Sequence, residues 1–250
     1  MRIFDVLAGL VPADSEIQDV SVGIFWTYVK TQYGSAISAT AHRWCPDPPG
    51  VLIPEAGHLR GMRADRLFPL YDSESLTARS LANAVVSASF STTEMTGTRY
   101  PGKGQELLES LCHGGMRHIA LIGHFHFADA LRDLGHQLDI YELDGRCEEG
   151  DLPSSCIPER LRYADIVVMT SSTLVTHSTE HILSHCRPDA YRMIVGPTVP
   201  LHPALWDFGF DAVCGNVITD DEGVSMGVRE GGTHKQLTGC EKYIFLRPSR

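Results

Sequence analysis

Polar and glycine residues follow four apolar segments in the second half of the chain, each where a strand is expected to end. In an open parallel sheet, ligands bind outside the carboxyl ends of the strands. We therefore expect these residues to meet in one crevice that binds a small molecule. In chain order the four groups are Gly123, His124 and Phe125, then Glu142, Leu143 and Asp144, then Ser171, Ser172 and Thr173, and finally Gly196, Pro197 and Thr198.

Gly123 and Glu142 indicate the class of ligand. Gly123 stands alone, without the Gly-x-Gly-x-x-Gly spacing of a pyrophosphate-binding turn. Glu142 ends the next expected strand, where a carboxylate can accept hydrogen bonds from two ribose hydroxyls. The pair favours an adenosyl ligand without pyrophosphate, such as S-adenosylmethionine, over NAD. Solvated acids at the strand end are the alternative interpretation.

Histidines indicate a second kind of chemistry. His124 and His126 flank Phe125, so an extended turn would point both imidazoles into the crevice, and His202 follows the fourth strand. Neutral imidazole is the commonest ligand of transition metals, so His124 and His126, together with His202 or alternatively Cys214, could bind a divalent transition metal. A structural role, with one histidine capping a helix and another packing on the sheet, is the competing interpretation.

Three weaker patterns lie outside this set. His177, His181 and His185 recur at four-residue steps, which on a helix predicts a solvated polar stripe. Arg43 follows an expected strand and could meet an anionic ligand. The segment 97–104 resembles a phosphate-binding loop but lacks the Ser or Thr after its lysine. We interpret it as a linker that could touch a ligand through Arg99, Tyr100 or Lys103.

Alternating strands and helices position the four groups. Such alternation over about 130 residues indicates a parallel sheet with right-handed crossovers, as in Rossmann-like domains. Strands are expected over residues 118–122, 138–143, 164–169, 191–195 and 212–215. Helices are expected over residues 105–112, 128–134, 179–185 and 204–208.

The first half of the chain predicts a different unit. Residues 19–29 and 33–41 are rich in β-branched and aromatic types and predict two paired strands. A proline-rich loop over 45–69 and a helix over 74–90 follow. The predicted fold class is therefore α/β, with a small α+β N-terminal domain over residues 1–104. A Rossmann-like parallel-sheet domain follows over residues 105–250.

Composition excludes several classes of function. The chain has 21 basic and 31 acidic residues, a net charge of −10, which disfavours binding to nucleic acid or to anionic membranes. No window approaches the ~18 apolar residues of a membrane span. The seven cysteines are scattered and never form a Cys-x-x-Cys pair. We expect a cytoplasmic protein without structural disulfides.

Four segments resemble the family called putative heavy-metal chelation. They are residues 122–125, 141–144, 164–168 and, above all, 196–209 with the sequence GPTVPLHPALWDFG. The resemblance implies a Rossmann-like C-terminal domain joined to a domain similar to the N-terminal domain of enolase, with the active site between them. It also implies a homodimer. The chain departs from the family pattern at 89–95 and 176–178, so this member could have its own ligand or reaction.

These observations predict a small-molecule-binding protein whose interdomain cleft holds an adenosyl-type metabolite such as S-adenosylmethionine. Whether the protein is an enzyme stays open. If it is, the expected reaction is group transfer from S-adenosylmethionine or its intramolecular cyclisation, because these displacements mainly need alignment of the reacting groups. The alternative is a transition-metal-binding or metal-delivery protein without turnover.

Overall fold

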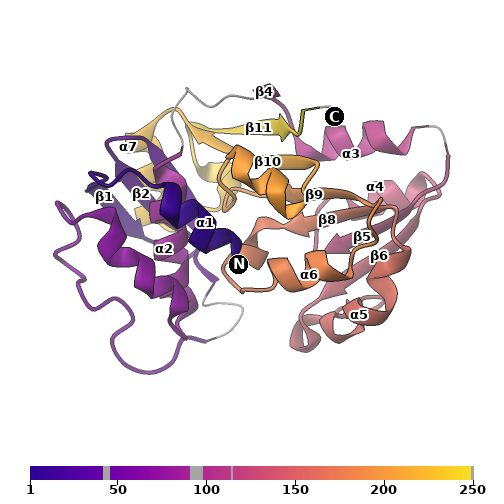
Figure 1. Cartoon of the computed structure of the whole chain (residues 1–250), viewed down its shortest axis with the longest axis horizontal. Helices are drawn as coiled ribbons and strands as arrows, with labels where there is room; N and C mark the ends of the chain where they lie inside the picture. The colour runs from indigo at the N-terminus through magenta and orange to yellow at the C-terminus, as the bar shows by residue number, and fades with distance from the viewer. Residues whose placement is uncertain (42–45, 91–97, 114, 249–250) are drawn as a thin grey trace.

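The computed structural model describes residues 1–41, 46–90, 98–113 and 115–248 (Figure 1). Arg43 and most of the departure at 89–95 therefore lie outside the described residues. Within the described part the chain forms a small antiparallel sheet and a larger, mostly parallel one. The small sheet has the order β1-β2-β3, with bounds Ile17–Val22, Trp26–Thr31 and Ser35–Ala39.

The larger sheet has eight strands in the order β4-β11-β10-β9-β8-β5-β6-β7. All neighbouring pairs from β10 to β7 are parallel, whereas β11 runs antiparallel to both β10 and β4. The bounds are Thr98–Pro101 (β4), His118–Ile122 (β5), Gln137–Glu142 (β6), Leu152–Pro153 (β7), Ile166–Thr170 (β8), Tyr191–Val195 (β9), Ala212–Ile218 (β10) and Cys240–Leu246 (β11). The predicted α/β class and the parallel sheet are confirmed.

The order of the strands reverses at β5, which lies between β6 on one side and β8 on the other. The chain therefore leaves the carboxyl ends of β5 and β8 in opposite directions. In doubly wound sheets such a switch point leaves a crevice where ligands bind.

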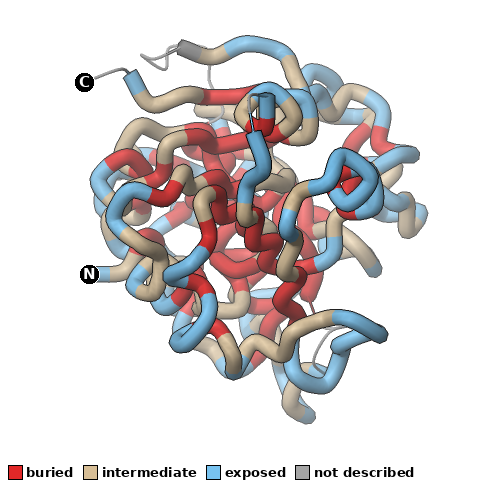
Figure 2. Tube along the Cα trace, turned by 90° about the vertical axis from the view of Figure 1, so that its right-hand side faces the viewer, coloured by how far each residue is buried: buried red, intermediate tan, exposed pale blue. Residues whose placement is uncertain are grey.

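Helices cover both faces of the larger sheet and also pack on the small sheet. They are α1 (Ile3–Leu10), α2 (Leu76–Ala88), α3 (Gly104–Cys112), α4 (Ala128–Asp133), α5 (Ile157–Arg160), α6 (Thr179–His185) and α7 (Asp221–Arg229). Side chains alternate between faces along a strand. Accordingly, Ala120 and Ile122 of β5 pack in a cluster with α1 and α6, whereas Ile119 and Leu121 pack with α3 and α4. Figure 2 shows the buried segments gathered in the middle of the molecule.

Helix α2 is buried on almost every side, with only Arg79 partly exposed. It packs against β2 and β3 of the small sheet and against the 3₁₀ helix η2 (Ala64–Asp72). A helix that is buried all round needs small side chains where neighbours approach closely, and α2 is rich in Ala and Ser. It begins close to residue 74, where the predicted helix starts, and its N-cap is Ser75, whose Oγ accepts from the Ala78 N–H at 3.1 Å.

The two halves of the chain are joined by crosswise contacts. Helix α1 packs on the larger sheet, and its Ile3 N–H donates to Glu180 Oε1 at 2.7 Å. Conversely, α7 packs on the small sheet, where Tyr28 OH donates to Asp221 Oδ1 at 3.0 Å. Strand β4 also pairs with β11 although it precedes residue 104. A domain division at residue 104 stays a prediction, as does the likeness of the first domain to enolase.

Sequence patterns missed some elements of the fold. The single strand expected over 19–29 is in fact two strands, β1 and β2, because residues 23–25 form a turn in which the Gly23 N–H donates to the Trp26 carbonyl at 2.9 Å. Helices α1 and α7 and strand β11 were not predicted. None of the helices in the described ranges is long and apolar enough to cross a membrane.

Candidate functional site

A cavity of about 500 Å³ lies at the carboxyl ends of β5, β6 and β8, at the switch point of the larger sheet. This volume is within the range of about 300–1,000 Å³ that is typical of small-molecule sites. Seven of the twelve residues predicted to bind a cofactor line it: Gly123, His124, Glu142, Leu143, Asp144, Ser172 and Thr173. The structure therefore brings members of three of the four predicted groups together, without Phe125 and Ser171.

The fourth predicted group lies elsewhere. Thr198 Oγ1 accepts from the Ala39 N–H at 3.0 Å, and the Thr198 carbonyl accepts from Asn83 Nδ2 at 2.8 Å. Thr198 thus lies at the contact between the two halves of the chain, and none of Gly196, Pro197 and Thr198 lines the cavity. The Ser171 Oγ accepts from the Thr198 N–H at 3.2 Å, so Ser171 is directed to the same contact.

Phe125 also points away from the cavity. Its ring stacks on Phe127 with a centroid distance of 5.0 Å and packs against the apolar cluster under α3 and α4. The cavity also lies in a different place from the cleft between two domains that the sequence led us to expect. All residues that line the cavity fall between Ile122 and Ile182, so the cavity belongs to the larger sheet rather than to a cleft between the two halves.

Gly123 makes the turn that ends β5. Its φ angle is +95°, a backbone conformation that residues with a side chain rarely adopt. A Cβ atom at this position would also lie 3.0 Å from Cγ2 of Thr170 on the adjacent strand β8. The absence of a side chain therefore lets the β5 and β8 turns pack closely beneath the cavity.

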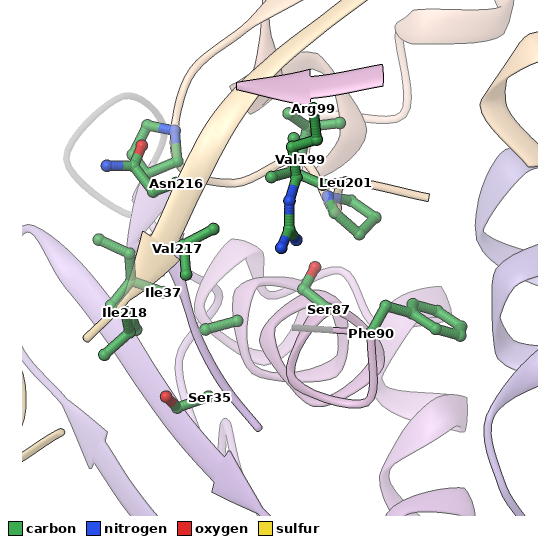
Figure 3. A pocket seen from close by; sticks show the side chains of 13 residues that line it. Ser35, Ile37, Ser87, Phe90, Arg99, Val199, Leu201, Asn216, Val217 and Ile218 are labelled. Carbon is green, nitrogen blue, oxygen red and sulfur yellow. The ribbon is translucent and has the colours of Figure 1, made fainter. Parts of the chain in front are cut away.

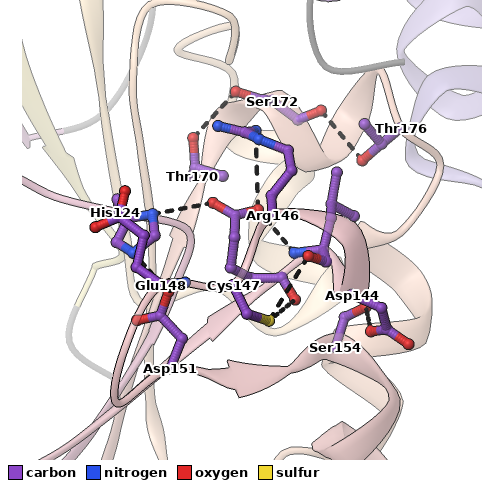
Figure 4. A network of polar contacts seen from close by, with 12 residues as sticks. His124, Asp144, Arg146, Cys147, Glu148, Asp151, Ser154, Thr170, Ser172 and Thr176 are labelled. Carbon is purple, nitrogen blue, oxygen red and sulfur yellow. Dashed lines mark hydrogen bonds and ion pairs between the residues drawn. The ribbon is translucent and has the colours of Figure 1, made fainter.

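A network of ion pairs and hydrogen bonds lies along the β6 side of the cavity (Figure 4). The His124 ring lies between two carboxylates, with Nδ1 3.3 Å from Glu142 Oε2 and Nε2 2.8 Å from Asp151 Oδ2. Both carboxylate side chains are buried, at 9 % and 4 % exposure, whereas His124 is 34 % exposed. A neutral imidazole has only one N–H, so both contacts are hydrogen bonds only when each ring nitrogen carries a proton.

The segment after β6 adds residues that the sequence patterns did not indicate. Arg146 Nη1 lies 3.9 Å from Glu142 Oε1, and Asp144 Oδ1 accepts from Ser154 Oγ at 2.9 Å. Hydrogen bonds from Ser154 and Ser155 hold the pKa of Asp144 below its usual value. Neither Arg146 nor Asp151 immediately follows an apolar strand segment, so nothing in the strand-end pattern pointed to them.

Hydroxyl groups line the β8 side of the cavity. Thr170 Oγ1 and Ser172 Oγ are 3.1 Å apart, and Thr176 Oγ1 and Ser178 Oγ are 3.0 Å apart. Thr176 and Ser178 belong to the segment that departs from the family pattern. His177 between them has a φ angle of +57° and precedes α6, so the predicted histidine stripe contains at most His181 and His185.

The structure does not bring His124, His126 and His202 together as a metal centre. His202 Nδ1 accepts from the Ala204 N–H at 3.1 Å, and its ring packs on Phe90 with a centroid distance of 4.4 Å. Among the described residues, no group of three or more His, Cys, Asp or Glu side chains is arranged to hold a metal ion. His202 instead caps the 3₁₀ helix η7 (Pro203–Phe208).

Comparisons with known proteins agree with this fold. Residues 106–247 match the DUF364 family and residues 4–90 match DUF4213, both described as putative heavy-metal chelation. Two crystal structures of DUF364 proteins of unknown function share the fold, each with a TM-score of 0.81 and 98 % coverage of both chains. They come from Desulfitobacterium hafniense (18 % identity) and Pyrococcus horikoshii (17 % identity).

No curated protein matches the sequence significantly. The match to DUF364 alone covers more than half of the chain, and it includes β5, β6, β8 and the cavity that they carry. The chain therefore belongs to the family described as putative heavy-metal chelation, as the motifs around residues 122–144 and 196–209 predicted.

Proposed function

We propose that the cavity at the carboxyl ends of β5, β6 and β8 binds an adenosyl-type metabolite, with S-adenosylmethionine as the expected ligand. The observation that carries this proposal is the position of Glu142. Its carboxylate lies at the end of β6, one strand from the switch point, and lines a cavity large enough for a nucleoside. In doubly wound folds an acid near the end of this strand binds ribose hydroxyls.

Glu142 has the hydrogen-bonding capacity for this role. A carboxylate offers about four lone-pair positions. In the structure Oε1 accepts from the Leu143 N–H at 2.8 Å, and Oε2 faces His124. These contacts orient the carboxylate and leave lone pairs for two further donors, which the 2′ and 3′ hydroxyls of a ribose would supply.

The charges around the cavity also suit S-adenosylmethionine. Its sulfonium group is positive and its amino acid end carries a carboxylate. Glu142 and Asp144 offer negative charge and Arg146 offers a guanidinium on the same side of the cavity. The lone Gly123 turn, without further glycines, disfavours a pyrophosphate.

If the ligand is turned over, the reaction is displacement at a carbon attached to the sulfonium. A nucleophile forms a bond to that carbon while the carbon–sulfur bond breaks, and the electron pair stays on sulfur. The nucleophile is a second substrate in group transfer and the ligand's own amine in cyclisation. The protein contributes mainly by holding the reacting groups in line, an effect of up to several kcal/mol.

Thermal unfolding with S-adenosylmethionine and S-adenosylhomocysteine tests the proposal. A ligand that binds the native state raises its Tm, so both compounds are expected to raise it. The Glu142→Ala variant should lose this rise, whereas Glu148→Ala, which removes an exposed glutamate from the same segment, should keep it. Absence of a rise in the wild-type protein, or an equal rise in Glu142→Ala, would overturn the proposal.

Transition-metal binding is the second candidate, and the description of the family is the observation that favours it. Stoichiometric zinc, nickel or copper should then raise the Tm, and the rise should survive in Glu142→Ala. A rise with metal and none with either adenosyl compound would reverse the order of the two candidates. A homodimer likewise stays a prediction.

A further inference from the structure

A second, much smaller cavity lies between the two halves of the chain (Figure 3). Its volume is about 20 Å³, and its walls come from β3, α2, β4, β10 and residues 197–201. Most of the lining is apolar, including Ile37, Phe90, Leu201 and Val217. It shares no lining residue with the cavity at the ends of β5, β6 and β8.

Arg99 brings a positive charge into this apolar space. It lies on β4, opposite Phe245 of β11, and its guanidinium packs over the Tyr243 ring at 5.3 Å from the centroid. Its Nη1 atom is buried and has no hydrogen-bond partner among the described residues, and no carboxylate in the described ranges forms an ion pair with it. A buried charge without a partner is costly, so buried guanidinium groups are normally paired.

Ser87 of α2 provides a second unpaired group. The residue is only 4 % exposed, and its Oγ has no hydrogen-bond partner in the described part of the chain. Serine in a helix usually bonds to the carbonyl four residues earlier. Ser80 and Ser89 do so, donating to Leu76 and Val85 at 2.7 and 3.2 Å. Ser87 does not, and in Figure 3 its hydroxyl and the Arg99 guanidinium point towards each other.

We propose that this small cavity between the two halves of the chain binds a small carboxylate anion, which accepts hydrogen bonds from the Arg99 guanidinium and the Ser87 hydroxyl. An anion satisfies both the unpaired donor atoms and the unpaired charge, whereas a water molecule would satisfy only the donors. The cavity is somewhat larger than the ~10–15 Å³ that one water requires. That space suits formate or the carboxylate end of a larger acid and is too small for a phosphate ester.

Thermal unfolding with sodium formate tests the proposal, with formamide as the neutral isostere and sodium chloride as the ionic-strength control. At about one hundred times its Kd, formate should raise the Tm by about 5 °C or more relative to both controls. Arg99→Met should abolish this rise, and Ser87→Ala should weaken it. Lys103→Met, which removes an exposed cation near the same strand, should leave it unchanged.

The outcomes separate this site from the proposed adenosyl site. Glu142→Ala should keep the formate effect, and Arg99→Met should keep the effect of S-adenosylhomocysteine. The formate effect and the S-adenosylhomocysteine effect could both be lost in Arg99→Met and in a folded Ser87→Ala protein. In that case Arg99 belongs to the adenosyl site, and a separate site is disproved. An equal rise with formate and formamide, or no rise with formate in the wild-type protein, also overturns the proposal.

Discussion

The Nε2 atom of His124 lies 2.8 Å from Oδ2 of Asp151, and this contact links the turn after β5 to the segment that precedes β7. The other ring nitrogen of His124, Nδ1, lies 3.3 Å from Glu142 Oε2, so the contact with Asp151 orients the imidazole towards that carboxylate. The β6 side of the large cavity is thus supported by Asp151, a residue that does not directly follow any predicted strand.

Asp151→Asn is expected to weaken this wall. The amide loses the charge that pairs with His124, and the free energy of unfolding should fall by about 1–3 kcal/mol, as for a buried hydrogen bond to a charged group. Urea denaturation measures the change. Asp129→Asn, at a carboxylate side chain that is 90 % exposed, should change it by less than about 0.5 kcal/mol. Equal effects of the two variants would contradict the role given to Asp151.

Gly123→Ala is expected to destabilise the fold at the switch point. The φ angle of +95° and the 3.0 Å approach to Thr170 Cγ2 both oppose a methyl group. The loss should be at least about 1–2 kcal/mol, the cost of a left-handed conformation for a residue with a side chain. Gly145→Ala is the control, since no atom lies within 4 Å of its added Cβ. A Gly123→Ala protein as stable as the control would show that the turn tolerates a side chain.

Stability is expected to fall when the pH drops below the ordinary pKa of histidine, about 6.5. Burial lowers the pKa of His202 in the folded protein, so the unfolded chain takes up its proton first and unfolding becomes more favourable. Protonation of Nδ1 would also remove the acceptor for the Ala204 N–H. The loss begins near pH 6.5 and continues until the folded pKa is reached.

Tm measured from pH 8 to pH 5 tests this dependence. His202→Asn keeps a capping acceptor but does not titrate, so its profile should be flatter. His58→Gln, at an exposed histidine, should retain the wild-type profile. A His202→Asn profile as steep as that of the wild type would assign the pH dependence to other groups.

Thr198→Val is expected to weaken the contact between the two halves. The valine cannot accept the hydrogen bond from the Ala39 N–H, which stays buried, at a cost of about 1–3 kcal/mol. Thr198→Ser retains the hydroxyl and should lose less stability. Chemical denaturation of both variants measures the difference. If serine and valine lower the stability equally, the lost methyl packing rather than the hydrogen bond explains the effect.

Local patterns predicted the parallel strands of the larger sheet well. The strands expected at 118–122 and 191–195 coincide with β5 and β9. In β5 the apolar run Ile119–Ile122 is buried throughout, as a strand covered on both faces requires. The same reasoning failed for α1 and β11. Helix α1 packs on elements far away in sequence, and β11 contains the exposed residues Glu241 and Lys242, so its apolar run is only Tyr243–Leu246.

The sequence alone determined the α/β class, the family and three of the four residue groups that meet at one edge of the sheet, since strand ends and switch points follow from local periodicity and chain order. Only the tertiary structure decided that Thr198 joins the two halves, and that Asp151, Arg146, Ser87 and Arg99 lie where they do. Apart from Arg146, whose ion pair with Glu142 is local, their surroundings come from segments distant along the chain, and burial and pairing of charge are properties of those contacts rather than of any local pattern.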